Sequence, residues 1–120
     1  MKISYILTTL NEEKHIEKII NEIDSLNDDY EIIIIDDSTS DKTLYLINKF
    51  KNSKIKVYIR DFNSGLGSAI VSGIFHTTGE LICWLDVSMD YHVKNIVNAS
   101  KKINENDIIL FSRYVIGGGD

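Results

Sequence analysis

Four short polar segments carry the side chains that could bind a ligand or a metal ion. Each of them follows a run of apolar residues, and they span 8–12, 36–41, 61–67 and 86–90. Their carboxylate, hydroxyl and amide oxygens suit hydrogen bonds to sugar hydroxyls and base N–H groups, and they also suit hard divalent cations. No segment is specific by itself, because each could equally form an ordinary turn.

The segment 86–90 is the candidate cation site. Its alternating oxygen side chains, from Asp86, Ser88 and Asp90, could converge on one Mg²⁺ or Mn²⁺ ion. A cation there would neutralise a diphosphate group and help it to leave. The alternative is a strand-to-helix turn in which Asp90 caps the following helix.

Asp36 and Asp37 directly follow an apolar strand-like run. A carboxylate in that position can accept hydrogen bonds from a ribose hydroxyl or from a base N–H group. Aspartate, serine and threonine also form Asx-turns and helix N-caps, and the local sequence alone favours this turn interpretation.

Glycines precede the helix predicted from Ser68. The segment Asn63-Ser64-Gly65-Leu66-Gly67-Ser68 resembles a phosphate-binding loop at a helix N-terminus. It has neither the full dinucleotide-binding fingerprint nor a P-loop lysine, which argues against a Rossmann dehydrogenase. A tight turn between a strand and a helix is the alternative.

The remaining reactive side chains give weaker signals. Arg113 follows the last predicted strand and could bind a phosphate through two parallel hydrogen bonds, or form a surface salt bridge. The three histidines are too scattered along the sequence to suggest a metal site. Cys83 is expected to be a small buried hydrophobe, and Trp84 to lie in the core or in a pocket wall.

The composition is that of one ordinary globular domain. The chain has 120 residues, of which 43% are hydrophobic and 26% are charged. Its net charge of −5 argues against a nucleic-acid-binding surface, and it means that an anionic nucleotide needs a metal ion or local basic groups. The single cysteine excludes an intrachain disulfide, which suits a reducing compartment.

Strand-like and helix-like segments alternate along the chain. Strands are predicted at 3–7, 31–35, 55–59, 81–85 and 108–111. Helices are predicted at 11–26, 42–50, 68–77 and 91–103, the third with Gly79 as its C-cap signal. The expected inward helix residues are Ile16, Ile19, Ile20, Ile23 and Leu26, then Ile70, Val71, Ile74 and Phe75, then Val93, Ile96, Val97 and Ser100. The alternation predicts an α/β, Rossmann-like, three-layer α/β/α fold with a mainly parallel sheet, in which ligands bind beyond the carboxyl ends of the strands.

In order and spacing, these segments resemble the motifs of family 2 glycosyltransferases of the GT-A fold, over essentially the whole chain. Residues 6–12 stand where the family has a strand and P-T-Y-N-E, 35–43 resemble V-D-D-S-S-x-D-G-T, and 65–80 resemble G-L-G-x-A…G…A-x-G-E. Residues 86–90 occupy the D-A-D-L-Q position. Residues 112–119 closely match S-R-Y-V-x-G-G-G, which is typical of the polyprenyl-phosphate (dolichol-phosphate) mannosyl and glucosyl transferases.

The resemblance implies a role for each matching residue. The implied nucleotide-sugar-binding residues are Thr8, Leu10, Glu12, Ile35, Asp37, Asp86, Val87, Ser88 and Arg113. The implied catalytic residues are Asp86, Asp90 and Arg113. The implied ligands of a Mg²⁺ or Mn²⁺ ion are Asp86, Ser88 and Asp90.

The implied reaction transfers a hexose, with mannose expected first, from GDP-mannose or a UDP-sugar to a polyprenyl or dolichyl phosphate. Inversion by in-line attack of the acceptor phosphate is expected, so that catalysis rests on positioning and charge neutralisation. The implied location is the cytoplasm, at the cytoplasmic face of a membrane for a lipid acceptor. The alternative is a catalytically inactive nucleotide-sugar-binding module or oligomeric scaffold. A nucleotidyltransferase is disfavoured because the loop at 8–12 is neither glycine-rich nor basic.

The sequence departs from the family pattern in four respects, one of which is Lys42 in place of the glycine of D-G-T. Thr8 and Leu10 replace the proline and tyrosine of the first motif, so a stacking surface for the base is lost. Ser88 replaces the second aspartate of D-x-D, and Asp90 could restore that charge. Residues 1–120 are expected to form a single GT-A-like nucleotide-sugar-binding domain without the family's acceptor-binding C-terminal part. The strand edges that this part would cover are then exposed, which predicts a homodimer or higher oligomer.

Overall fold

The computed structural model describes residues 1–9, 13–37, 45, 49–50, 52–60, 65–86 and 93–103. Within these ranges the elements are β1 (Ile3–Thr9), α1 (Glu13–Leu26), β2 (Tyr30–Asp36), β3 (Ile55–Ile59), α3 (Leu66–Phe75), β4 (Leu81–Asp86) and α4 (Val93–Ser100). These elements agree with the predicted alternation of strands and helices to within a few residues at their ends. The strand expected at 108–111 and most of the helix expected at 42–50 lie outside the described residues.

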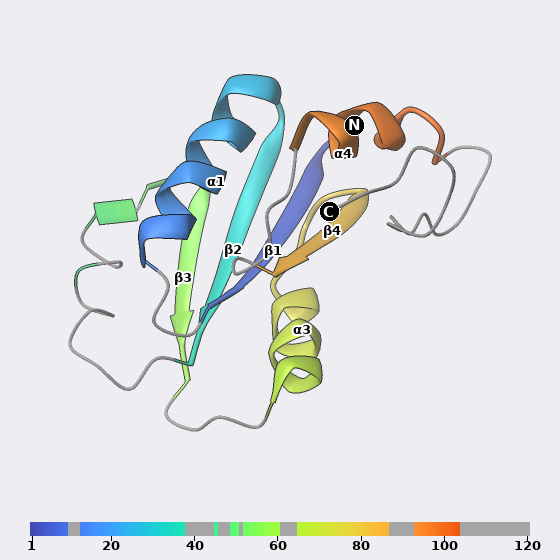
Figure 1. Ribbon diagram of the computed structural model, residues 1–120. Coiled ribbons are helices and arrows are strands. Elements are labelled where there is room, and N and C mark those ends of the chain that lie inside the picture. Colours follow the sequence, from blue (N-terminus) through green and yellow to red (C-terminus); the bar gives the residue numbers. More distant parts are fainter. Residues whose placement is uncertain are drawn as a thin grey trace, which may run out of the picture.

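The strands form a four-stranded parallel sheet in the order β3-β2-β1-β4 (Figure 1). The chain adds β2 and then β3 on one side of β1, and it then crosses back to place β4 on the other side. The strand order therefore reverses between β1 and β4. In α/β sheets, ligands bind at the carboxyl ends of the strands that flank such a reversal.

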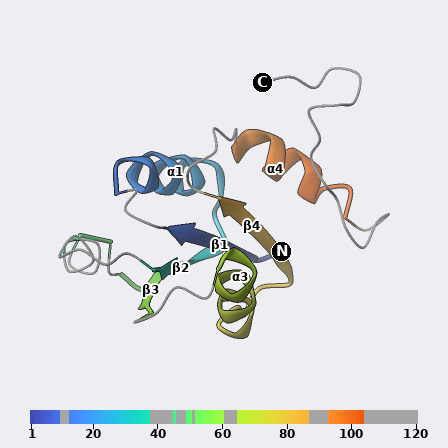
Figure 2. The ribbon, with the colours of Figure 1, turned by 60° about the horizontal axis from the view of Figure 1, so that its bottom comes forward.

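Helices cover both faces of the sheet, as the predicted three-layer arrangement requires. Figure 2 shows α1 and α4 on one face and α3 on the other. The two central strands are buried along their whole length, which confirms that the isoleucine run of β2 faces apolar surroundings on both sides. Alternate residues of β2 divide between two clusters, with Ile32 and Ile34 under α1 and α4, and Ile33 and Ile35 under α3.

The apolar stripes of α1 and α4 face the sheet nearly as predicted. Four of the five residues expected to face inward from α1 are buried, and Val93 and Ile96 of α4 are buried beside the half-buried Val97 and Ser100. Leu26 is exposed, contrary to the expectation. It is the last residue of α1 and lies at the margin of the stripe, so it is not drawn into the core.

Small residues bring α3 close to the sheet. Ala69 and Gly73 are its buried residues, and Ala69 packs against Ile33 and Ile35. A Cβ atom at Gly73 would lie 2.5 Å from Cγ2 of Ile6, closer than real carbon atoms approach one another. The glycine therefore allows the helix backbone to rest directly on β1.

The inward face expected for α3 was wrong. Val71, Ile74 and Phe75 are all exposed, Phe75 by 84%, and Ile70 is only half-buried. The large side chains satisfy a helical period, but the narrow gap between α3 and the sheet admits only alanine and glycine. The helix is therefore rotated so that its small residues face inward.

Gly79 is not the C-cap of α3, which corrects the second expectation for this helix. The helix ends at Phe75, and His76 occupies the C-cap position. Gly79 instead packs against the start of β1, where its N–H donates to Ser4 Oγ at 2.8 Å. A Cβ atom at Gly79 would lie 2.5 Å from that oxygen and 2.8 Å from the carbonyl oxygen of Lys2. Only glycine fits this contact between the α3–β4 connection and β1.

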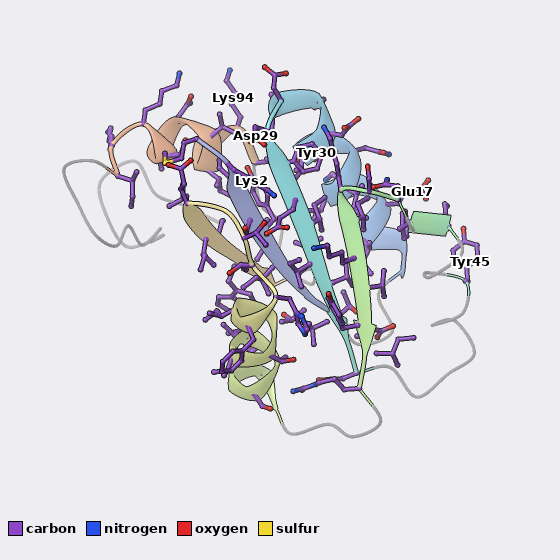
Figure 3. The ribbon with its side chains drawn as sticks, turned by 180° about the vertical axis from the view of Figure 1, so that it is seen from behind. Lys2, Glu17, Asp29, Tyr30, Tyr45 and Lys94 are labelled. Carbon is purple, nitrogen blue, oxygen red and sulfur yellow. The ribbon has the colours of Figure 1, made fainter. Side chains whose placement is uncertain are left out.

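A buried carboxylate, Glu31, completes the same contact at the amino ends of the strands. Ser4 Oγ and the N–H of Thr78 both donate to Glu31 Oε1, at 2.6 Å and 2.5 Å, and Lys2 Nζ lies 3.7 Å from Oε2. Figure 3 shows Lys2 at this end of the sheet. Burial by itself raises the pKa of Glu31, but the hydrogen bonds from Ser4 and Thr78 and the charge of Lys2 outweigh it and lower the pKa overall.

Candidate functional site

The carboxyl ends of the four strands meet at one edge of the sheet. In the pairing of β1 with its neighbours, Thr9 lies opposite Asp36 and Thr8 lies opposite Asp86. Asp86 thus ends β4 at the point where the strand order reverses. The polar residues that the sequence placed after different strands are therefore neighbours in space, as the parallel topology requires.

Backbone hydrogen bonds extend this edge by one residue on two strands. The N–H of Asp37 donates to the carbonyl of Thr9 at 3.1 Å, and the N–H of Arg60 donates to the carbonyl of Asp36 at 3.0 Å. Asp37 and Arg60 are therefore held on continuations of β2 and β3. Side chains on such supports keep a more precise orientation than those on free loops.

Asp37 and Arg60 form a bidentate ion pair. Arg60 Nε donates to Asp37 Oδ1 and Arg60 Nη2 donates to Asp37 Oδ2, each at 2.6 Å. The side chain of Arg60 is only 10% exposed, and that of Asp37 only 9%. The hydrogen bonds to Asp37 raise the pKa of the Arg60 guanidinium further above its ordinary value. Asp37 is thus a fixed hydrogen-bond acceptor, held by a partner that the local sequence did not indicate.

Arg60 also contacts the first turn of α3. Its Nη1 donates to Ser68 Oγ at 2.8 Å, and its Nη2 lies 3.5 Å from the carbonyl oxygen of Gly65. Gly65 is the N-cap of α3. Its backbone φ is +90°, a conformation that residues other than glycine rarely adopt. One guanidinium therefore connects the ends of β2 and β3 with the start of α3.

The sequence alone did not single out Arg60. Its position directly after β3, beside a strand that ends at Asp36 and is followed by Asp37, could have revealed it. Neighbouring parallel strands bring the residues that follow them together, so an arginine there is a natural partner for Asp37.

The end of β1 carries two threonines with different environments. Thr8 Oγ1 accepts a hydrogen bond of 3.2 Å from Trp84 Nε1, so the indole of β4 leans over the end of β1. Thr9 Oγ1 is buried, and among the described residues no group forms a hydrogen bond with it. Trp84 is 38% exposed, so it does not lie in the core.

The predicted site residues fall into two groups. Thr8, Ile35, Asp37 and Asp86 come together at the carboxyl edge of the sheet. The Ile35 side chain is fully buried and packs in the cluster with Ala69. The second group lies outside the described residues and comprises Leu10, Glu12, Val87, Ser88, Asp90 and Arg113.

A protein-family comparison decides which family this arrangement represents. The model described as glycosyl transferase family 2 matches residues 4–120. The chain belongs to glycosyl transferase family 2. Among curated proteins, this family member is 32% identical to a dolichol-phosphate mannosyltransferase of Pyrococcus furiosus, over 98% of this chain and 35% of that protein. The predicted resemblance is confirmed.

Solved structures with the same fold include S. aureus TarS (residues 1–349), with a TM-score of 0.70 and 26% identity over 89% of this chain and 33% of that one. The mannosyltransferase PcManGT from Pyrobaculum calidifontis, in complex with GDP-Man and Mn²⁺, has a TM-score of 0.72 over 88% of this chain and 33% of that one. At 19% identity, this second likeness shows the fold alone.

A third similar structure is glucosyl-3-phosphoglycerate synthase from Mycobacterium tuberculosis, in complex with Mn²⁺, UDP and glucosyl-3-phosphoglycerate. It is 30% identical to this chain, with a TM-score of 0.56, over 72% of this chain and 33% of that one. These likenesses confirm the predicted GT-A type of fold. The family 2 chain spans about a third of the length of these relatives.

Proposed function

We propose that this chain is the donor-binding part of a glycosyltransferase that transfers a hexose, mannose in the first instance, from a nucleotide-diphosphate sugar to a polyprenyl or dolichyl phosphate. The observation that carries the proposal is the polar edge at the reversal of strand order, where Thr8, Asp37 and Asp86 meet in a family 2 domain. The mannosyltransferase relative supports the sugar and the acceptor. The structural relative bound to UDP, which is 30% identical to this chain, supports a nucleotide-diphosphate sugar as the donor class.

Asp37 is proposed to bind the nucleoside. Its carboxylate is buried, fixed by Arg60 and directed from the end of β2, so it can accept a hydrogen bond from a base N–H or a ribose hydroxyl. Thr8, Leu10 and Glu12 would border the same nucleoside, with Ile35 nearby as a buried support beneath the site. Because Leu10 stands where the family pattern has a tyrosine, no aromatic ring stacks on the base from this position, and we expect weak affinity for the base.

The residues proposed to hold a divalent cation are Asp86, Ser88 and Asp90. All three side chains offer oxygen, which is the donor that Mg²⁺ and Mn²⁺ prefer, and Asp86 ends β4 opposite Thr8 at the proposed diphosphate position. Such a cation would offset the negative charge of the diphosphate leaving group. The structural relative that contains Mn²⁺ and is 30% identical to this chain supports this choice of metal.

The remaining residues are proposed to contact phosphate groups. Arg113 is proposed to pair with a phosphate of the donor or of the acceptor, and Val87 to line the diphosphate. The acceptor phosphate is ionised at neutral pH, so it can attack the anomeric carbon directly and invert its configuration without a strong general base. An acceptor of this kind would place the protein at the cytoplasmic face of a membrane. None of the described helices is long and apolar enough to cross one.

Calorimetric titration tests the donor site. GDP, UDP, GDP-mannose and UDP-glucose would be titrated into the protein with and without Mn²⁺, and the same series repeated with Asp86→Asn. We expect metal-dependent binding of one nucleotide and loss of the metal dependence in the variant. A folded wild-type protein that binds none of these ligands would overturn the proposed function.

A non-catalytic, self-associating module is the second candidate, and the surface of β4 favours it. β3 and β4 are the outer strands of the described sheet. β3 carries Lys56, a charge that discourages edge-to-edge pairing, whereas residues 81–85 of β4 are all uncharged. Ile82 and Trp84 are 44% and 38% exposed on β4. A second copy of the chain pairing along β4 would cover them, which accounts for the predicted homo-oligomer.

A further inference from the structure

Arg60 is the side chain that joins three elements at the candidate site. Its own backbone continues β3, its Nε and Nη2 atoms hold both oxygens of Asp37, and its Nη1 atom reaches Ser68 on α3. Removing the guanidinium would therefore release Asp37 and the start of α3 at the same time.

The geometry leaves Asp37 able to bind a ligand. A carboxylate accepts about four hydrogen bonds, two on each oxygen, and Arg60 occupies one position on each. The pair is nearly buried, and the positive charge of Arg60 compensates the negative charge of the carboxylate. A compensated carboxylate suits a neutral N–H or O–H donor of a nucleoside, and it is a poor site for a cation.

We propose that Arg60 is a positioning residue, which fixes Asp37 in the orientation that accepts a hydrogen bond from the donor nucleoside and couples this orientation to the N-terminal turn of α3. The proposal rests on the donor site proposed above. It assigns Arg60 no contact with the reacting atoms.

The fork shape of the guanidinium makes the proposal specific. Lysine keeps the positive charge at position 60 but offers a single ammonium group, which cannot hold both oxygens of Asp37 and Ser68 Oγ in one plane. Arg60→Lys therefore tests orientation separately from charge. Ser68→Ala tests the coupling to α3 without touching Asp37.

The experiment compares two ligands in the wild-type protein and in Arg60→Lys. The dissociation constant of the preferred nucleoside diphosphate is measured by calorimetry with Mn²⁺, and that of inorganic pyrophosphate with Mn²⁺ is the control. We expect Arg60→Lys to weaken the nucleotide about tenfold or more and to leave pyrophosphate unchanged. Equal weakening of both ligands would mean a merely structural role, and it would overturn the proposal.

A double-mutant cycle with Asp37→Asn shows whether Arg60 acts through Asp37. If it does, Arg60→Lys changes nucleotide affinity less than threefold in the Asp37→Asn background (on the order of 0.5 kcal/mol). Full additivity of the two losses would overturn the proposal. If Arg60→Lys binds the nucleotide as tightly as the wild-type protein does, the proposed role of Arg60 is overturned and the proposed function stands. If the wild-type protein binds no nucleotide, both the role of Arg60 and the proposed function are overturned.

Discussion

The backbone of Gly73 in α3 lies directly on Ile6 of β1, so closely that a Cβ atom would sit 2.5 Å from Cγ2 of Ile6. Ile6 is fully buried and branched at Cβ, so its side chain has little room to move aside. The spacing between α3 and the sheet, and with it the position of Ser68 beside Arg60, depends on the absence of one side chain.

Gly73→Ala is therefore expected to destabilise the protein by about 1–3 kcal/mol, because the added methyl group overpacks the contact with Ile6. Gly67→Ala is the matched control in the same helix, since a Cβ atom there meets nothing within 4 Å. The control should be neutral or stabilise by up to about 1 kcal/mol through helix propensity. Urea unfolding monitored by circular dichroism measures both, and equal stabilities of the two variants would contradict the packing explanation.

The lowered pKa of Glu31 predicts that the folded protein loses stability at acid pH. Its folded pKa is lowered, so its contribution is complete above the unfolded pKa near 4.5 and is lost as the pH falls through the folded value. Glu31→Gln keeps the shape but loses the charge beside Lys2, and it should cost about 1 kcal/mol at pH 7. Thermal unfolding at pH 7 and at pH 3 should show a difference between the two proteins that shrinks at acid pH. A constant difference would contradict the assigned role.

Cys83 is expected to react slowly with thiol reagents. It packs against the main core from β4, and burial raises the pKa of its thiol to about 12, so almost no thiolate is present at pH 8. Reaction with a disulfide reagent at pH 8 should be about 100-fold or more slower in the folded protein than in the protein unfolded by guanidinium. Similar rates in the two states would show that the thiol is accessible.

The main features of the fold could be predicted because they depend on local patterns. The isoleucine run of β2 and the stripe from Ile16 to Ile23 in α1 are strong periodic signals, and the alternation of such segments dictates a parallel sheet. The rotation of α3 could not be read in the same way. Its apolar residues fit a helical period on either face, and only contact with Ile6 shows that Gly73 must point inward.

The candidate site was predictable to the level of strand ends and no further. Thr8, Asp37 and Asp86 follow from the rule that ligands bind at the carboxyl ends of parallel strands. Arg60 required knowledge of which strands are neighbours, because 23 residues separate it from Asp37 in the sequence. Side-chain pairings of this kind depend on register, which single-sequence patterns do not specify.

The uncharged edge of β4 leads to a prediction about self-association. Ile82→Lys would give β4 a lysine at its second residue, as Lys56 does in β3, and it should weaken a dimer formed along this edge by about tenfold or more. Val71→Lys is the control, because Val71 is exposed on α3 while its neighbours Ala69 and Gly73 face the sheet. Sedimentation velocity over a range of concentrations measures the association. The fluorescence of the one tryptophan, Trp84, reports on the same surface from two residues away. A wild-type chain that stays monomeric at high concentration, with unchanged Trp84 emission, would refute pairing along β4.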